Sequence, residues 1–365
     1  MKKFVTFAVL TALAAGIGGA QTKWVNPATA DIDAVQNQAW PKELKGTFHR
    51  IPDREEKNLR KPLWDLSRNS AGLAIRFKTH SPSVAVRYTV EGPHAMPHMP
   101  ATGVSGVDMY RINPDGSKDY CFGGYSYGDT IRFNYGNLAP DLNGPAQEYL
   151  LDLPLYNTVS WLEIGVPKDA EFTLVPRDER KPVVVYGTSI AQGACSSRPG
   201  MAWANIVGRT LDLPLVNLGF SGNGRLEPEM IKLLNEIDAS VYILDCMPNL
   251  TQKTADEAKQ LVLDAVAQIR AKSNTPILLV EHAGYSNAPT NPSQLECYTR
   301  LNRGQRAAFD ELAAKGTPHL FYLTHDEIGF SPDAWVDYVH PSDLGAQTQA
   351  NAVIPMVKKI LNIAD

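Results

Sequence analysis

The sequence has few of the features that mark metal-dependent, nucleotide-binding or nucleic-acid-binding proteins. Its 365 residues include only four cysteines, with no Cys-x-x-Cys pair and no Cys/His cluster at zinc-ligand spacing. No Gly-x-x-x-x-Gly-Lys-Ser/Thr motif and no His-Glu-x-x-His motif occurs, which excludes a P-loop and a metalloprotease helix of the usual kind. Lys and Arg total 35 against 39 Asp and Glu, without a basic block, so the charge pattern indicates no nucleic-acid partner.

Long hydrophobic runs are also missing, apart from one near the N-terminus. Lys2 and Lys3 precede an apolar stretch over residues 4–15, and Gly18-Gly19-Ala20 follows it. This order is typical of a secretory signal peptide over residues 1–20, and the apolar stretch is too short to span a bilayer. We therefore expect a secreted or periplasmic protein without a stable membrane span.

Residues 21–178 have the pattern of an all-β domain. Short segments alternate apolar and polar residues, turn sequences such as Asn113-Pro114-Asp115-Gly116 separate them, and no long amphipathic helix lies between them. The pattern predicts a β-sandwich or jelly roll. The predicted strands cover residues 74–78, 84–90, 148–153, 159–166 and 172–175.

Residues 179–365 follow a different rhythm, in which short apolar runs alternate with helical patterns. This alternation predicts a three-layer α/β domain with a five-stranded parallel sheet and helices on both faces. The charged stretch 177–181 marks the boundary between the two domains. The predicted strands are 183–186, 215–218, 241–244, 277–280 and 320–323, and the clearest helices are 255–271, 295–315 and 344–361.

Candidate catalytic residues follow from where ligands bind in such a sheet, at the carboxyl ends of its strands. Ser189 follows the first predicted strand on a strand-to-helix turn, where a base could activate its hydroxyl as a nucleophile. Asp337 and His340 stand three residues apart, so the carboxylate could orient the imidazole as that base. Taken singly, an N-cap serine and a surface Asp-x-x-His pair are both common. Other histidines that could serve as the base are His282, His319 and His325.

A serine nucleophile also needs hydrogen-bond donors for the oxyanion that forms. Gly219, after the second predicted strand, could offer a backbone N–H, and Asn249, after the third, a side-chain amide. Ser189 could add its own backbone N–H. A turn glycine and an asparagine that satisfies nearby backbone are the structural alternatives. The glycines of residues 219–224 lack dinucleotide-binding spacing and do not open the domain, so they favour no such cofactor.

The order of these residues resembles the SGNH (GDSL-type) hydrolase superfamily over residues 182–365. The resemblance implies a flavodoxin-like domain with strand order 2-1-3-4-5, and a serine esterase that needs no metal or cofactor. It implies that Ser189 is the nucleophile, His340 the general base and Asp337 its orienting acid. It also implies an oxyanion hole, formed by Ser189, Gly219 and Asn249.

Two departures from the family pattern resemble a two-domain subgroup common in polysaccharide-degrading bacteria. Thr188 replaces the usual aspartate, and Met247-Pro248-Asn249 replaces Gly-x-Asn-Asp. The N-terminal β domain of that subgroup carries a Gly-x-Asp-Leu-Tyr-like signature, and this chain has Gly106-Val107-Asp108-Met109-Tyr110. Residues 64–67, 69–72 and 198–201 also look like that subgroup, so the resemblance extends over most of the chain.

Two further hypotheses concern residues near the expected site. Cys195 and Cys246 follow the first and third strands, which are neighbours in the implied strand order, so we consider a disulfide between them. His94 and His98 lie in a proline-rich loop that could bind a metal, although an ordinary loop is the simpler interpretation. Alternatively, this loop or Tyr110 helps to shape the substrate pocket.

Together these features predict a secreted serine esterase that hydrolyses O-acyl groups, most simply acetyl, on polysaccharide or oligosaccharide. One alternative is a lipid-acting esterase or thioesterase of the same superfamily. Another is a non-catalytic carbohydrate-binding protein, but binding alone requires no triad. Neither the sugar nor the oligomeric state follows from the sequence.

Overall fold

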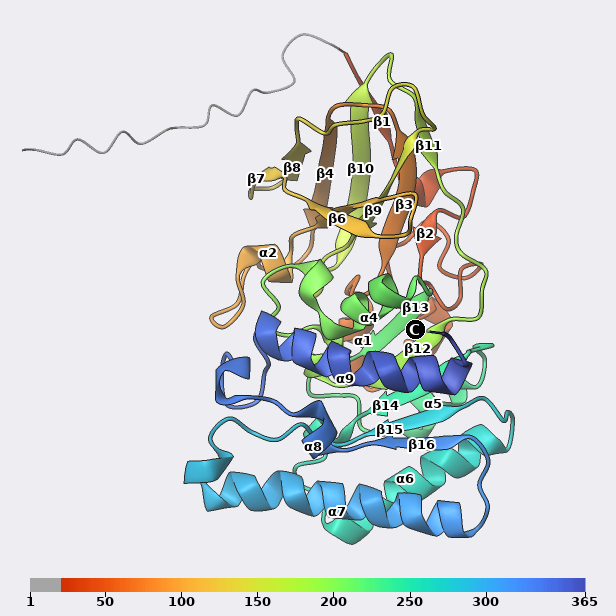
Figure 1. Ribbon diagram of the computed structural model, residues 1–365, viewed down its shortest axis with the longest axis vertical. Helices are drawn as coiled ribbons and strands as arrows, with labels where there is room; N and C mark the ends of the chain where they lie inside the picture. Colours follow the sequence, from red (N-terminus) through yellow and green to blue (C-terminus); the bar gives the residue numbers. More distant parts are fainter. Residues whose placement is uncertain (1–20, 365) are drawn as a thin grey trace, which may run out of the picture.

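The computed structural model describes residues 21–364, which form an antiparallel β-sandwich stacked on an α/β domain (Figure 1). The signal peptide expected over residues 1–20 lies outside the described residues. Within residues 21–364, no helix is both long and apolar enough to cross a membrane.

The β-sandwich consists of two antiparallel sheets, as the sequence predicts. One has the order β1-β10-β4-β8-β7; the other has the order β11-β3-β9-β5-β6, with β2 paired to β3. In β8 every second residue is buried, as expected for a strand with one face on a core. The strands are β1 (Thr22–Val25), β2 (Val35–Gln36), β3 (Ala74–Thr79), β4 (Val84–Val90), β5 (Asp108–Ile112), β6 (Lys118–Cys121), β7 (Gly124–Ser126), β8 (Ile131–Tyr135), β9 (Gln147–Asp152), β10 (Val159–Pro167) and β11 (Phe172–Leu174).

The α/β domain contains a parallel sheet in the order β13-β12-β14-β15-β16, which is the flavodoxin-like order 2-1-3-4-5. Every residue of β12, β13 and β14 is buried, because helices cover both faces of the sheet. The expected fold class is therefore confirmed. The strands are β12 (Val183–Gly187), β13 (Leu215–Gly219), β14 (Val241–Asp245), β15 (Ile277–Val280) and β16 (Leu320–Leu323).

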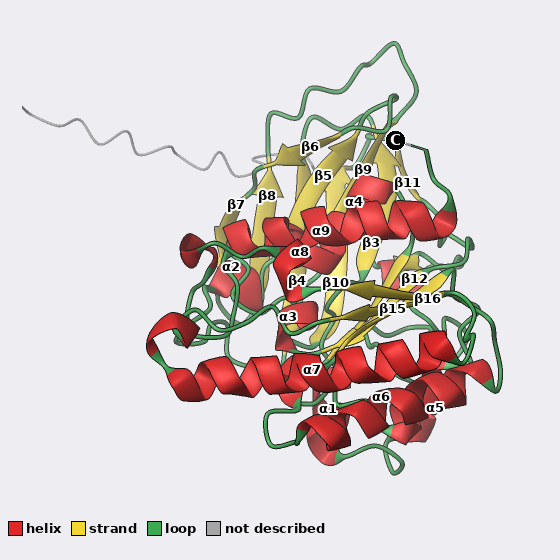
Figure 2. Cartoon of the chain, turned by 60° about the horizontal axis from the view of Figure 1, so that its bottom comes forward, coloured by secondary structure: helices red, strands yellow, loops and turns green. Residues whose placement is uncertain are grey.

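The long helices form two layers around this sheet (Figures 1 and 2). On one face α4 (Trp203–Leu211) packs against α9 (Asp343–Leu361). On the other, α6 (Ala255–Arg270) packs between α5 (Pro228–Leu234) and α7 (Pro292–Ala314). Shorter helices are α1 (Lys61–Ser67), α2 (Ala101–Val104), α3 (Ser189–Gln192) and α8 (His325–Ile328). Single 3-10 turns occur at Pro27–Thr29, Asp53–Glu55, Pro199–Met201, Met247–Asn249, Ala288–Thr290 and Pro332–Ala334.

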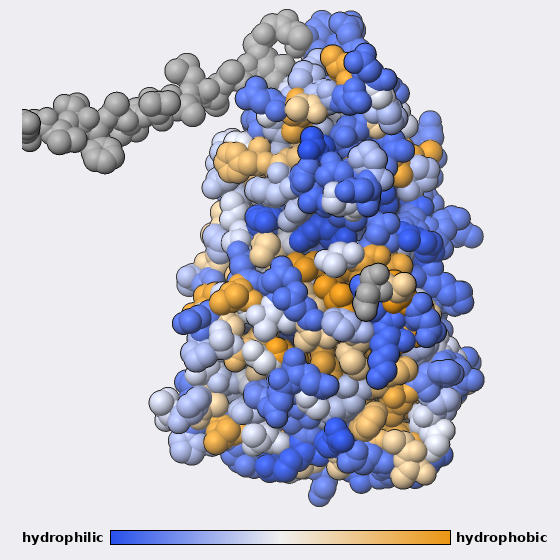
Figure 3. Space-filling model, viewed as in Figure 1, coloured by the Kyte–Doolittle hydropathy of each residue, from blue (hydrophilic) through white to orange (hydrophobic). Residues whose placement is uncertain are grey.

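Part of the segment before β3 packs on the α/β domain, while other residues of it, such as Val35 and Phe48, belong to the sandwich core. Trp40, Leu44 and Leu63 are buried in the hydrophobic cluster that also contains α5 and α6. Trp40 Nε1 donates a hydrogen bond to Glu236 at 2.9 Å. In the view of Figure 3, hydrophobic residues gather where the two parts of the molecule meet. The two domains therefore share an apolar interface.

Candidate active site

Ser189 begins α3, directly after strand β12. A β carbon at Gly187 would lie 2.7 Å from the carbonyl oxygen of Asp245, so only glycine fits at the end of this strand. Thr188 then caps the helix, its hydroxyl accepting from the N–H of Ile190 at 3.3 Å. Thr188 therefore has a local structural role at the position where the family usually has aspartate.

Ser189, His340 and Asp337 form a continuous chain of hydrogen bonds. His340 Nε2 lies 3.0 Å from Ser189 Oγ, and His340 Nδ1 lies 2.8 Å from Asp337 Oδ2. Asp337 Oδ1 also accepts from the backbone N–H groups of Val339 at 2.8 Å and His340 at 2.7 Å. The loop before α9 thus brings His340 and Asp337 to Ser189 in the hydrogen-bonded arrangement of a Ser-His-Asp triad.

The environment of Asp337 favours its ionised form. Burial alone would raise its pKa, but hydrogen bonds from the His340 ring and from two backbone N–H groups outweigh burial, and the net pKa is lowered. An ionised carboxylate at Nδ1 holds a proton on that nitrogen and leaves Nε2 free to accept the proton of Ser189. Ser286 keeps the loop in place, donating to the carbonyl oxygens of Tyr338 at 3.0 Å and Asp337 at 3.1 Å.

The structure does not make Gly219 available as an oxyanion donor. Its N–H donates to Asn217 Oδ1 at 2.8 Å, and a β carbon there would lie 2.2 Å from the backbone nitrogen of Gln192. This glycine is required for close packing of β13 against α3, contrary to the role expected from the sequence. In the same loop, the N–H of Gly222 makes no hydrogen bond within residues 21–364, and neither does that of Ser189.

Asn249 lies beside this loop at the end of a 3-10 turn after β14. The side-chain amide of Asn249 has two possible orientations. The one that fits its surroundings has Oδ1 accepting from the N–H groups of Asn223 at 3.0 Å and Gly224 at 3.2 Å. This contact joins the loops that follow β13 and β14. With Oδ1 occupied in this way, Nδ2 is the part of the side chain that can donate to an oxyanion.

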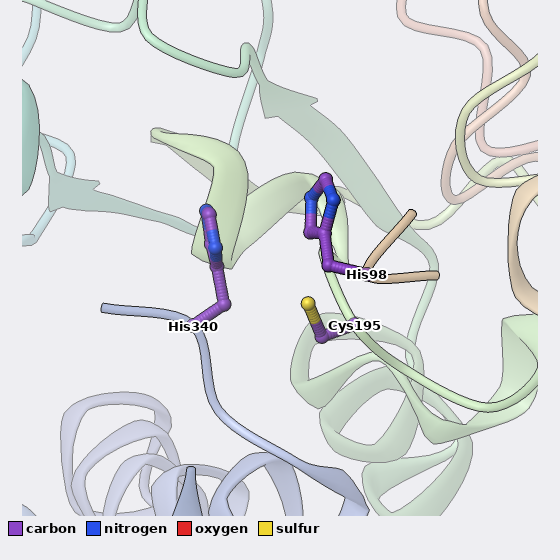
Figure 4. A group of neighbouring side chains, drawn as sticks. All are labelled: His98, Cys195 and His340. Carbon is purple, nitrogen blue, oxygen red and sulfur yellow. The ribbon is translucent and has the colours of Figure 1, made fainter. Parts of the chain in front are cut away.

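The β-sandwich reaches the site through the loop between β4 and α2. The His98 ring from this loop stacks on the His340 ring with centroids 5.6 Å apart, and Cys195 lies beside both (Figure 4). His94, from the same loop, contacts Tyr127 of the sandwich instead. The loop expected to shape the pocket therefore lies at the candidate catalytic base. His94 and His98 contact different rings, so they do not form a shared metal site in this structure.

Comparisons with known proteins agree with this geometry. Residues 180–358 match the model of the GDSL-like Lipase/Acylhydrolase family, and residues 22–172 match the model described as the N-terminus of Esterase_SGNH_hydro-type. A crystal structure from Bacteroides ovatus, described as a GDSL-like lipase, has 31% sequence identity and a TM-score of 0.85. The match covers 94% of this chain and 99% of that chain. The chain belongs to the SGNH (GDSL-like) hydrolase family.

Two other solved structures share the fold at lower identity. A salicylyl-acyltransferase from a tetracycline biosynthetic pathway has 18% identity and a TM-score of 0.70, covering 94% of this chain and 98% of its own. A family two carbohydrate esterase from Cellvibrio japonicus has 11% identity and a TM-score of 0.55, covering 94% and 99%. No curated protein matches the chain.

In this SGNH hydrolase, the Gly-x-Asp-x-Tyr segment forms hydrogen bonds between the two domains. Asp108 Oδ2 accepts from Arg198 Nη1 at 2.6 Å and from the N–H of Gly200 at 2.9 Å. The Tyr110 hydroxyl accepts from the same Arg198 nitrogen at 2.5 Å. Tyr110 is only 5% exposed, so it acts in this contact rather than on the surface of a pocket.

Other contacts that position α3 are not apparent from the sequence. The Tyr156 hydroxyl donates to the carbonyl oxygen of Ser189 at 3.1 Å. Gln192 Nε2 donates to the carbonyl of Leu155 at 3.1 Å, and Gln192 Oε1 accepts from the N–H of Ser221 at 3.0 Å. Because these partners are far apart in sequence, no local pattern identifies them. The sandwich thus supports the helix that begins with the nucleophile.

The considered disulfide between Cys195 and Cys246 is not formed. All four cysteines, which lie within the described residues, are free. Cys195 packs in a small cluster with Leu155, whereas Cys246 lies in the cluster under α5 and α6, with Sγ 3.5 Å from the carbonyl oxygen of Tyr186. Helix α3 separates Cys195 from the end of β12, whereas Cys246 directly follows β14, so the two side chains pack in different clusters.

The other histidines do not contact the nucleophile. His282 is buried and its Nδ1 accepts from the N–H of Gly284 at 2.9 Å. His325 Nδ1 lies 3.0 Å from Asp326, and its ring stacks on Tyr298. Within residues 21–364, the histidine hydrogen-bonded to Ser189 is His340.

Proposed function

We propose that this SGNH hydrolase is a secreted serine esterase that removes O-acetyl groups from polysaccharide or oligosaccharide. The observation that carries the proposal is the hydrogen-bonded chain from Ser189 Oγ through His340 to Asp337. Ser189 is only 7% exposed, so its environment is largely provided by the protein.

In the proposed reaction, His340 Nε2 takes the proton of Ser189 as Oγ attacks the ester carbonyl. The N–H groups of Ser189 and Gly222 and the Asn249 amide stabilise the resulting oxyanion. His340 then donates its proton to the oxygen of the leaving sugar alcohol, which gives an acetyl-enzyme. A water molecule, deprotonated by His340, releases acetate and restores Ser189.

Exposed aromatic side chains support a carbohydrate substrate. Tyr120, Phe122 and Tyr125 are 45%, 70% and 50% exposed and line a pocket of the sandwich together with Arg198 and Ser197. Flat exposed rings offer apolar faces on which the C–H faces of sugars can stack. A family two carbohydrate esterase from Clostridium thermocellum, solved with cellohexaose, shares the fold at 11% identity and a TM-score of 0.51.

This aromatic pocket is linked to the candidate active site through two segments. Thr102 Oγ1 donates to the carbonyl oxygen of Ser197 at 2.6 Å. Thr102 follows the loop that carries His98, and Ser197 follows Cys195. The aromatic pocket and the candidate active site are therefore bordered by the same two segments of the chain.

The experiment that tests the proposal is acetate release from a panel of acetylated polysaccharides. The wild type should release acetate, and Ser189→Ala should not, whereas Ser160→Ala, an exposed serine of the sandwich, should behave as the wild type. Equal release by Ser189→Ala would disprove the assigned nucleophile. Release from none of the substrates by the wild type would disprove the substrate class.

A second candidate function is hydrolysis of longer acyl esters. Val336 and Tyr338 are 48% and 51% exposed on the loop that carries Asp337 and His340, which gives apolar surface beside the triad. A series of p-nitrophenyl esters distinguishes the two functions. Highest kcat/KM for acetate supports the first proposal, and highest kcat/KM for a long chain supports the second.

A further inference from the structure

Three potential metal ligands lie together at the candidate active site, two of them without a role in the proposed mechanism. His98 comes from the sandwich loop, Cys195 from the segment after α3, and His340 from the loop before α9 (Figure 4). One ligand atom from each lies within 4.8 Å of the other two. His98 is exposed and Cys195 is buried, so the group opens to solvent on one side.

Histidine nitrogen and cysteine sulfur are the ligands that Zn²⁺ prefers in proteins. Tetrahedral bonds of about 2.0–2.3 Å place two ligand atoms of one ion about 3.5 Å apart. The rings of His98 and His340 are stacked with an interplanar angle of 27°, so binding of one ion by both requires the exposed His98 ring to turn out of this stack. Three protein ligands would leave the fourth tetrahedral position for water.

The surroundings of His340 already match those of a metal ligand. Its Nδ1 is 2.8 Å from Asp337 Oδ2, and zinc-bound histidines commonly donate their second ring N–H to a carboxylate in this way. The nitrogen left for an ion is Nε2, which faces Ser189 Oγ at 3.0 Å. An ion at Nε2 would therefore remove the base from the nucleophile.

The backbone at Cys195 supports a role for its side chain. Cys195 has φ +63°, in the left-handed region that glycine adopts without strain. A residue with a β carbon is less stable in this conformation than glycine. The thiol would lose its proton to solvent as the S–Zn bond forms.

We propose that His98, Cys195 and His340 form a binding site for Zn²⁺, and that the bound ion reversibly inhibits the esterase. The inhibition rests on the proposed function, whereas the binding does not. The β-sandwich would then provide one ligand, and the α/β domain the other two, of a site that inhibits the enzyme.

Cobalt(II) tests the binding directly, because thiolate–cobalt charge transfer gives an intense near-ultraviolet absorption band. The mature chain and its Ser189→Ala variant should both show this band with Co²⁺, and Zn²⁺ should displace it. The band should disappear in Cys195→Ser and persist in Cys121→Ser. His98→Ala should weaken binding at least tenfold, and His94→Ala should not. Absence of the band in the wild type, or its persistence in Cys195→Ser, would overturn the site.

Ester hydrolysis tests the inhibition. Zn²⁺ should inhibit the wild type, and a chelator should restore its activity. His98→Ala should need at least tenfold more Zn²⁺ for half-inhibition, measured relative to its own metal-free rate, and His94→Ala should match the wild type. Equal sensitivity of His98→Ala and wild type would refute inhibition through this site. A cobalt band at Cys195 in a protein without esterase activity would support the metal site and refute only the proposed function.

Discussion

Arg198, in the α/β domain, donates a hydrogen bond to the buried carboxylate of Asp108, in the β-sandwich, at 2.6 Å. Arg198 lies three residues after Cys195, and Asp108 is the acidic residue of the Gly-x-Asp-x-Tyr segment. A β carbon at Gly106 would lie 2.3 Å from the carbonyl oxygen of Thr102, which explains the glycine of the same segment. The segment is therefore a structural contact between the domains, close to the candidate site.

Breaking this contact should affect both stability and catalysis. We expect Asp108→Asn to lower the free energy of unfolding by about 2–3 kcal/mol, because Arg198 loses its counter-ion in a partly buried position. We also expect a lower kcat/KM, because the segment that follows Cys195 would be less firmly held. Urea unfolding and ester hydrolysis measure the two effects. Asp119→Asn, which disrupts an exposed pair with Arg111, is the control, and an equal loss there would contradict the prediction.

The carboxylate of Asp337 should contribute to rate rather than to substrate binding. Asp337→Asn should lower kcat by about 10²–10⁴-fold with little change in KM, because the amide no longer fixes the Nδ1 proton of His340. Circular dichroism should show an intact fold. A large rise in KM with unchanged kcat would indicate that Asp337 binds substrate instead.

Three substitutions test the roles assigned to Asn249, Gly219 and Gly222. Asn249→Ala should lower kcat by about 10²–10³-fold, with KM nearly unchanged. The exposed Asn351 supplies a control alanine variant. Gly219→Ala should reduce stability, because its β carbon would meet Gln192 at 2.2 Å. Gly222 has open space around a β carbon but φ +68°, so Gly222→Ala keeps its N–H and strains the backbone that orients it. We expect a lower kcat together with a small loss of stability.

Thermal unfolding and kinetics with a soluble ester measure these effects. An unchanged melting temperature for Gly219→Ala, together with a large fall in kcat, would contradict the structural role assigned to Gly219 and favour a role in the oxyanion hole. Wild-type kcat and melting temperature for Gly222→Ala would contradict the prediction that this backbone conformation holds the N–H in place.

Asp245 should make stability fall as the pH rises. Burial raises its pKa to about 7, although a hydrogen bond from Gln349 at 3.2 Å opposes this. The native state therefore binds a proton more tightly than the unfolded state. This stabilisation is complete below about pH 4 and is lost as the pH rises through about 7.

Asp245→Asn should therefore raise the free energy of unfolding at pH 8 relative to the wild type, by a few kcal/mol at most. Urea unfolding at pH 5 and pH 8 measures the difference. Part of the wild-type slope should remain, because burial also raises the pKa of Asp152 to about 7. The exposed Asp264 serves as control through Asp264→Asn, and an equal change in that variant would contradict the assignment.

The sequence by itself determined the two-domain architecture and the order of the chemical groups. Strands β3, β4, β9 and β10 are long enough for their alternation to be visible, whereas β2, with two residues, and β7, with three, are too short. Strands β12 to β15 are fully buried and β16, at the edge of the sheet, is partly buried. Each therefore contains a short, mainly apolar run. Ser189, Asp337 and His340 could be named because their chemistry and their places after strands are local properties.

Only the tertiary structure decided which of these groups meet and which are already engaged. The N–H of Gly219 donates to the side chain of Asn217, two residues away. This hydrogen bond depends on the packing of β13 against α3. His98 lies against His340, although 242 positions separate them in the sequence. The contact between His98 and His340 depends on how the β-sandwich and the α/β domain pack together. Residue order therefore picked out Ser189, Asp337 and His340 as candidates, while the fold determined which groups lie beside them.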